Sequence, residues 1–326
     1  MNASTPLSSL SVGDSAALTR RVTRLSVGFA VLLSLIKLAA WISSSSVAML
    51  ASLADSGLDM LAASATFFAV RYAAEPPDHD HRFGHGKAEA FASLIQAGLV
   101  FASAALVGRE AIAHLLHPQA VTHEVWDLAV MIISTILTLV LIQAQTTVLK
   151  SAQSVAVTGD RLHYLADVAA NAMAFVGIGL SLVLRNPTAD AIAGLLVTAW
   201  LVWGAVGVFR SASVELMDQE LGQEARDQII ALMRQDPRVR GVHQLRTRAS
   251  GPYIHMQMHA DLDPDLTLVQ AHRVVVAAER RVLEAFPAAD ILIHPDPSGQ
   301  AEPHGGPFAE AHAEPDVAES EILTSR

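Results

Sequence analysis

The stretch Asp55-Ser-Gly-Leu-Asp59 places two acidic residues inside a long apolar run, Val47 to Val70, which otherwise predicts a membrane-spanning helix. A carboxylate near the middle of a bilayer costs roughly 2.5–3.5 kcal/mol on insertion scales. On a helix, residues four apart lie on one face, about one turn from each other. Two like charges this close in a low dielectric both stay ionised only with a cation between them, and otherwise one takes a proton.

Two interpretations of this acidic pair are open from the pair alone. In the first, the acids cap a helix or form hydrogen bonds between helices. In the second, they form half of a metal or proton site, as ionisable residues inside membranes commonly do. The rest of the chain favours the second interpretation.

The composition indicates an integral membrane protein with some soluble mass attached. Of the 326 residues, 52% are hydrophobic and 17% charged, against about 25% charged in soluble domains. The chain has no cysteine, so disulfides are excluded and a metal site must use His, carboxylate, Met or backbone groups. The polar segment 1–22 has no apolar core with a cleavage site, which predicts no removable signal peptide.

Six apolar runs are long enough, or nearly so, to cross ~30 Å of hydrocarbon. They lie at Leu25–Ile42, Val47–Val70, Ala88–Leu116, Trp126–Val148, Leu162–Leu184 and Ala189–Phe209, within a membrane domain at 23–210. Lys and Arg near the ends of these runs fall nine to one on the side of the loop Arg71–Lys87. This asymmetry predicts that the loop and both termini lie in the cytoplasm.

A soluble domain is predicted at 211–297. Helical spacing at 223–235 and 266–286, and strand patterns at 239–248, 252–262 and 291–293, give an αββαβ order. His255 and His259 fall on the same face of the second strand. The segment 298–326 is rich in Pro, Gly and acidic residues, and predicts a disordered acidic tail.

The second half of the membrane site is predicted in the fifth apolar run, where His163 and Asp167 are again four residues apart. Two such pairs on facing helices supply one imidazole and three carboxylates, enough for a tetrahedral site of the kind Zn²⁺ accepts. His163 stands almost at the start of its run, whereas Asp55 lies deeper. The two depths agree if the helix begins near Ser151 and polar residues such as Asp160 line a wet cavity.

The chain resembles the cation diffusion facilitator family, and within it most of all the bacterial zinc and ferrous-iron efflux group. The resemblance runs from about residue 20 to 297 and rests on both i, i+4 pairs, on the soluble-domain motifs Gly241-Val-His-Gln-Leu and Ile293-His-Pro-Asp296-Pro, and on the loop Asp78-His-Asp-His81-Arg-Phe-Gly-His85-Gly-Lys87. It implies a multi-pass homodimer of the cell inner membrane with six transmembrane helices and a metallochaperone-like (ferredoxin-like) α+β cytoplasmic domain. It also implies exchange of Zn²⁺, and of Fe²⁺, Cd²⁺ or Co²⁺, for protons, with no nucleic-acid partner.

Three metal sites follow from the resemblance. The residues carried over are Asp55, Asp59, His163 and Asp167 for transport, Asp78, His81 and His85 in the loop, and His243, His259, His272, His294 and Asp296 in the soluble domain. His255 is a candidate extra ligand outside the family pattern. Lys87 and Asp218 match a pair that ties the third span to the cytoplasmic domain.

The ligand set predicts antiport, because metal binding needs deprotonated ligands and therefore releases protons. The alternative is a non-transporting membrane metal sensor or scaffold that uses its cytoplasmic domain. No Gly-x4-Gly-Lys-Ser/Thr loop occurs in the sequence, which disfavours an ATP-driven pump. We expect a secondary transporter and not an enzyme.

Overall fold

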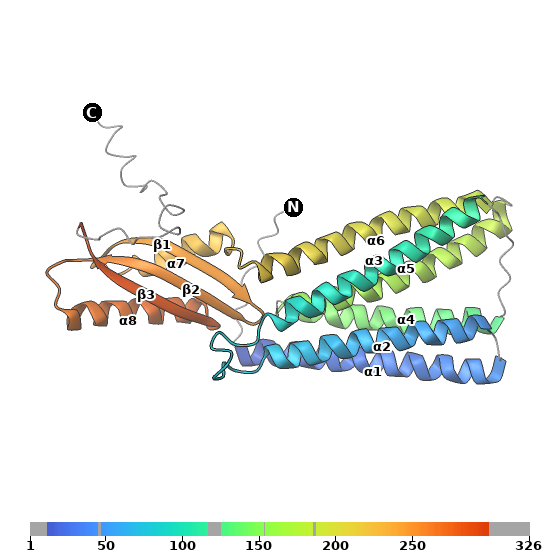
Figure 1. Ribbon diagram of the computed structural model, residues 1–326, viewed down its shortest axis with the longest axis horizontal. Helices are drawn as coiled ribbons and strands as arrows, with labels where there is room; N and C mark the ends of the chain where they lie inside the picture. The colour runs from blue at the N-terminus through green and yellow to red at the C-terminus, as the bar shows by residue number, and fades with distance from the viewer. Residues whose placement is uncertain (1–11, 45–46, 117–124, 153, 185–186, 300–326) are drawn as a thin grey trace, which may run out of the picture. The chain divides into compact units, whose positions relative to one another are not determined.

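The computed structural model describes residues 12–44, 47–116, 125–152, 154–184 and 187–299 (Figure 1). The predicted acidic tail, from residue 300 onward, and the first eleven residues lie outside this described part. The chain divides into two compact units. Among the described residues, the helical unit holds those from Val12 to Gln219 together with Arg248–Ile254, and the sheet unit holds Glu220–Thr247 and residues 255–299.

Six long helices build the helical unit. They are α1 (Val12–Ser44), α2 (Val47–Ala73), α3 (Ala88–Leu116), α4 (Val125–Leu149), α5 (Val155–Leu184) and α6 (Pro187–Leu216). Within the described residues, α1, α2, α3, α4 and α6 each contain a stretch long and apolar enough to cross a membrane. The first half of α5 instead carries Asp160, Arg161 and Asp167, the charged residues around the candidate site.

Helix α1 begins at Val12, well before the predicted apolar run at Leu25. Its first turns are polar by composition, but one face of them is buried, including Ser15, Thr19 and Thr23. The hydroxyl of Thr19 donates to the Ser15 carbonyl at 3.1 Å, and that of Thr23 to the Thr19 carbonyl at 2.9 Å. Because these hydroxyls bond to the preceding turn of their own helix, the polar segment can pack inside the bundle.

The helices form two groups that meet at α5 and where α2 packs against α3. Helix α1 packs against α2 and α4, while α3 packs against α6, and α5 contacts α3, α4, α6 and also α2 (Figure 1). Small residues allow this close packing. One buried cluster joins Val100 and Ala104 of α3 to Ala166 of α5 and Ala205 of α6. The packing brings the polar first half of α5 against α2.

The sheet unit has the predicted αββαβ order. It consists of α7 (Gln223–Met233), β1 (Val239–Ser250), β2 (Tyr253–Leu262), α8 (Leu268–Ala285) and β3 (Ala289–Pro297), with strand order β1-β2-β3. Met256 and Met258 of β2 and Val274 and Val282 of α8 are buried in its core. Strand β3 runs beyond the predicted Ile291–Ile293, because it pairs on one side only and an edge strand tolerates proline.

Candidate metal centres

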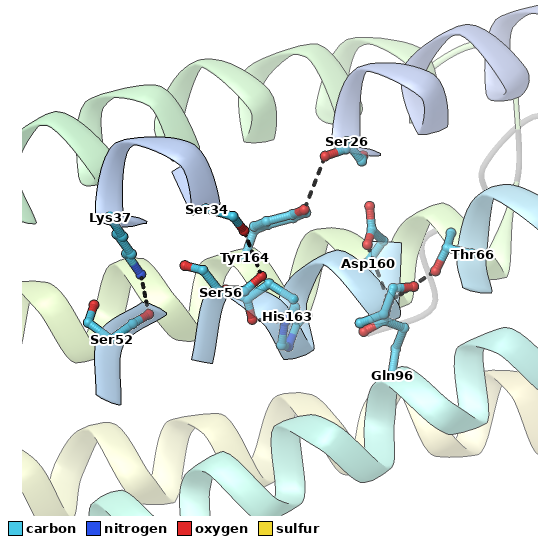
Figure 2. A network of polar contacts seen from close by, with 12 residues as sticks. Ser26, Ser34, Lys37, Ser52, Ser56, Thr66, Gln96, Asp160, His163 and Tyr164 are labelled. Carbon is cyan, nitrogen blue, oxygen red and sulfur yellow. Dashed lines mark hydrogen bonds and ion pairs between the residues drawn. The ribbon is translucent and has the colours of Figure 1, made fainter. Parts of the chain in front are cut away.

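The helical unit brings Asp59 of α2 together with His163 and Asp167 of α5. One ligand atom from each lies within 4.8 Å of the others, and the Nε2 atom of His163 is 3.0 Å from Oδ1 of Asp59. His163 is buried, and both carboxylates are half-buried. His163 lies in the network of polar side chains shown in Figure 2. Two i, i+4 positions predicted to face each other are therefore in contact.

The donor set of this centre suits a borderline divalent cation. The Nδ1 atom of His163 is buried and has no hydrogen-bond partner among the described residues. A buried imidazole nitrogen of this kind costs free energy unless something binds it. One imidazole with carboxylates is a ligand type that Zn²⁺ accepts, so the residues fit such an ion as cargo.

Asp55, the fourth predicted ligand, lies outside this group of three. It stands one turn before Asp59 on α2, where its carboxylate interacts electrostatically with Asp59, with His163 and with Lys37 of α1. In the described chain it is more exposed than the other three residues. The structure thus assembles three of the four predicted ligands and places the fourth next to them.

The prediction that Asp160 lines a wet cavity is wrong. Asp160 is fully buried one turn before His163, and its carboxylate accepts hydrogen bonds from Nε2 of Gln145 at 2.8 Å and from Nε2 of Gln96 at 3.2 Å. The other half of that prediction, a helix that starts before the apolar run, agrees with the structure. Helix α5 begins at Val155, four residues after the expected Ser151, so His163 lies about two turns inside the helix.

The two glutamines connect Asp160 to the rest of the bundle, and Figure 2 shows Gln96 between Asp160 and Thr66. Gln96 of α3 also donates to Oγ1 of Thr66 on α2 at 3.0 Å, and Gln145 of α4 donates to Oγ of Ser26 on α1 at 3.1 Å. One carboxylate on α5 is therefore linked to four other helices. The sequence analysis did not identify either glutamine. A polar side chain inside an apolar run nevertheless predicts a buried hydrogen-bond partner, and both glutamines fit that pattern.

The loop between α2 and α3 holds a second cluster, Asp78, His81 and His85, as predicted from the loop motif. Asp78 Oδ2 is 3.3 Å from Nε2 of His85, and Asp78 Oδ1 is 3.4 Å from Nδ1 of His81. Hydrogen bonds from the backbone N–H groups of His81 and Asp80 hold the pKa of the Asp78 carboxyl below its usual range. The turn therefore keeps this carboxylate charged and fixed in place.

Next to this loop, the turn between β1 and β2 packs against the ends of α3 and α6. Gly86 approaches Ser250 so closely that a Cβ atom on Gly86 would overlap the Ser250 carbonyl. The backbone N–H of Gly251 donates to Oε1 of Glu215 at 2.6 Å. Both contacts belong to the helical unit, so this turn is a fixed part of it.

The sheet unit holds the third cluster, centred on Asp296. Its Oδ2 atom is 2.8 Å from Nδ1 of His259 and 3.5 Å from Nε2 of His243, and its Oδ1 atom is 3.2 Å from Nε2 of His294. Asp296 is buried at the end of β3, which explains how one carboxylate meets residues from three strands. Four of the five residues predicted for this site are thus in contact.

Asp261 is a member of this cluster that sequence reasoning missed. Its Oδ2 atom is 3.4 Å from Nδ1 of His243, and it follows His259 by two residues on the same face of β2. The carboxylate also lies against Gly241, where any Cβ atom would collide with it. The two-residue spacing from His259 could have predicted this, because residues two apart on a strand lie on the same face.

Two histidines lie outside the cluster. His272, a predicted ligand, is exposed on α8 and belongs to none of the ligand groups found among the described residues. His255, the candidate extra ligand, contacts Asp290 instead, with Nδ1 to Oδ2 at 3.2 Å. Residues that share a strand face can therefore lie at different sites.

A bundle of long apolar helices and an αββαβ domain, each with clusters of His and Asp, define a multi-pass membrane protein with sites for divalent cations. Residues 23–217 match the cation efflux transmembrane domain, and residues 221–298 match the cation efflux protein cytoplasmic domain. The chain belongs to the cation diffusion facilitator family. It is a cation efflux transporter.

Individual relatives match over most of their length. The cation-efflux pump FieF of Shewanella oneidensis is 39% identical over 284 residues, covering 86% of this chain and 94% of that protein. FieF of Klebsiella pneumoniae is 38% identical over 266 residues, covering 82% and 88%. A solved structure of CzrB in its Zn form is 32% identical and covers 26% of this chain and 99% of that chain, with a TM-score of 0.25.

Proposed function

We propose that this transporter exports Zn²⁺ from the cytoplasm in exchange for protons, with Fe²⁺, Cd²⁺ and Co²⁺ as further substrates. The observation that carries the proposal is the 3.0 Å contact between Asp59 and His163, which joins ligand pairs on two different helices. One imidazole with carboxylates suits Zn²⁺ and Cd²⁺, tolerates Fe²⁺ and Co²⁺, and disfavours Mn²⁺ relative to an all-oxygen set.

Proton exchange is supported by the chemistry of the ligands. Carboxylates and imidazole bind a metal ion only when deprotonated, so binding Zn²⁺ releases the protons that the empty site holds. We propose that Asp55, Asp59, His163 and Asp167 take cargo from the cytoplasmic side and protons from the other side. The proton gradient then drives metal out of the cell.

We propose that the membrane domain spans 23–210 and the cytoplasmic domain 211–297, with both termini in the cytoplasm and the protein in the inner membrane as a homodimer. The nine-to-one distribution of Lys and Arg supports this orientation. The match to a cation efflux cytoplasmic domain supports the dimer. The loop cluster and the Asp296 cluster are then cytoplasmic sites that sense or hold metal.

Uptake of ⁶⁵Zn into energised inverted vesicles tests the proposal. Asp59→Ala should abolish uptake, and a pH-sensitive dye inside the vesicles should report proton movement with wild-type protein only. The matched control is Asp265→Ala, since Asp265 is exposed in the sheet unit and outside all three clusters. Parallel assays with Cd²⁺, Fe²⁺, Co²⁺ and Mn²⁺ establish the substrate range.

The protein level and the thermal stability of the detergent-solubilised protein must be measured alongside. Removing Asp59 also removes a costly buried charge, so stability should be unchanged or higher while transport is lost. Near-normal uptake by Asp59→Ala would overturn the role of Asp59 as a ligand in transport. Absence of uptake with the wild-type protein as well would favour the sensor or scaffold function.

A further inference from the structure

A lysine lies inside the first membrane helix, beside the candidate transport centre. Lys37 of α1 is half-buried, and its Nζ atom donates to the backbone carbonyl of Ser52 on α2 at 3.2 Å. Figure 2 shows Lys37 and Ser34 reaching from α1 to neighbouring turns of α2. An ammonium group within a membrane span is costly, and it is retained where it serves a function.

The position of Lys37 is set by two parallel contacts. Ser34, one turn earlier on α1, donates through Oγ to the carbonyl of Ser56 at 3.2 Å. Ser52 and Ser56 each precede one of the two α2 acids by three residues. The two contacts therefore hold the ammonium group against the turn of α2 that carries Asp55.

The charge of Lys37 acts on the ligands of the centre. Its ammonium group interacts electrostatically with Asp55 and with Asp167, so it affects both helices that supply the candidate ligands. Three ionised carboxylates, a neutral imidazole and a divalent ion sum to one negative charge. The empty site with three ionised carboxylates carries minus three, so the positive charge of Lys37 stabilises the empty site more strongly than the loaded one.

The same positive charge repels the cargo. We propose that Lys37 is a residue that sets cargo affinity: its ammonium group is a fixed counter-charge to Asp55 and Asp167 that weakens metal binding enough for release. This inference rests on the proposed transport function. It predicts that the charge at position 37, and not the hydrogen bond to Ser52, determines the affinity.

Three substitutions separate charge from hydrogen bonding. K37R keeps both charge and donor, K37Q keeps a donor without charge, and K37M removes both. Binding of Cd²⁺ or Zn²⁺ is measured by calorimetry on the full chain in detergent, at about pH 8 to limit proton competition. The background carries His81→Ala and His259→Ala, which disable the loop and sheet clusters.

We expect K37Q and K37M to bind metal more tightly, with Kd lowered on the order of tenfold, because a repelling charge is lost in a low-dielectric site. K37R should rescue the wild-type Kd. In vesicles, K37Q should lower the KM for Zn²⁺ together with the maximal rate, since tighter binding slows release. K150Q is the matched control, because Lys150 is exposed at the end of α4.

Unchanged Kd in K37Q with altered Kd in K37M would overturn the inference, because the hydrogen bond alone would then matter. Equal Kd in all four proteins would overturn it as well. If K37M aggregates, K37Q still decides the question, since it can keep the contact with Ser52. Asp59→Ala in the same background tests the proposed transport site separately from the role of Lys37. Retained metal binding in that variant would refute the transport site itself.

Discussion

The Nζ atom of Lys87 lies 3.0 Å from Oδ1 of Asp218, which joins the start of α3 to the residues that follow α6. Asp218 also receives NH1 of Arg248 at 3.1 Å through its other oxygen. The guanidinium group of Arg248 in turn lies 4.9 Å from the ring centroid of Phe83. One carboxylate therefore holds two cations from different segments of the helical unit.

A charge swap at positions 87 and 218 should not restore stability, because a lysine at 218 would face Arg248. Each half-exposed ion pair contributes about 0–1 kcal/mol, so Asp218→Ala, which removes two such pairs, should cost up to about 2 kcal/mol. The detergent melting temperatures of Lys87→Asp, Asp218→Lys and their double variant test this. Full recovery in the double variant would show that Arg248 has no part in the contact.

Gly86→Ala should strongly destabilise the helical unit. A Cβ atom on Gly86 would overlap the Ser250 carbonyl, so the backbone must move, at a cost of about 1–3 kcal/mol or more. Gly98→Ala on α3 is the matched control, since nothing lies within 4 Å of its Cβ position and alanine favours a helix. Thermal unfolding should show a lower midpoint for the first variant only.

The stability of the cytoplasmic domain should depend on pH through Asp236. Hydrogen bonds from Arg238 lower the pKa of this carboxyl to about 2 from its ordinary 3.8. The folded-state pKa is below the unfolded one, so the contribution is present above about pH 4 and is lost as the pH falls towards 2. Water screens this pair, because the Arg238 side chain is half exposed, so only part of the shift appears as stability. Urea unfolding of residues 211–297 should show Asp236→Asn less stable by about 1 kcal/mol at pH 6, with the difference vanishing near pH 2. A constant difference across this range would contradict the prediction.

His163→Asp should shift substrate preference towards harder cations. An all-oxygen site loses the borderline nitrogen ligand, so transport of Zn²⁺ should fall relative to that of Mn²⁺. Competition between the two metals in the vesicle assay gives the ratio directly. The same ratio in wild-type and variant protein would exclude His163 as a ligand of the cargo.

Asp296→Ala should weaken Zn²⁺ binding by the cytoplasmic domain more than His272→Ala does. Asp296 contacts three histidines, whereas His272 is exposed and outside the cluster. Loss of such a shared carboxylate should cost about 10- to 100-fold in affinity. Calorimetry at several protein concentrations provides the measurement. An equal loss for His272→Ala that appears only in the dimer would show that a second copy supplies this ligand.

Hydropathy and periodicity predicted the helical membrane region and the αββαβ order, because both patterns follow directly from which face of an element is buried. The same reasoning misplaced the start of α1, since its buried hydroxyls bond within their own helix and look polar in sequence. It also placed Asp160 in a wet cavity, because the partners Gln96 and Gln145 lie 64 and 15 residues away.

In the candidate site, too, local spacing could be predicted from the sequence, whereas contacts between distant residues could not. Pairs of ligands at i, i+4 can be found from spacing, as with His163 and Asp167. Contacts between helices cannot, and so the ammonium group of Lys37 beside the centre and the carboxylate of Asp261 beside His243 were both missed. Which residues of a face converge depends on helix packing, and a single sequence does not specify it.

Asp160 and His163, one turn apart, tie α5 to its neighbours and so determine how this helix can move. Asp160 receives donors from α3 and α4, and His163 contacts α2, so sliding or rotating α5 must break these bonds together. Lost bonds inside a bilayer cannot be replaced gradually by water. Intermediate positions of α5 are therefore costly, and the helix should move in discrete steps like a ratchet, with few half-way states through which ions could leak.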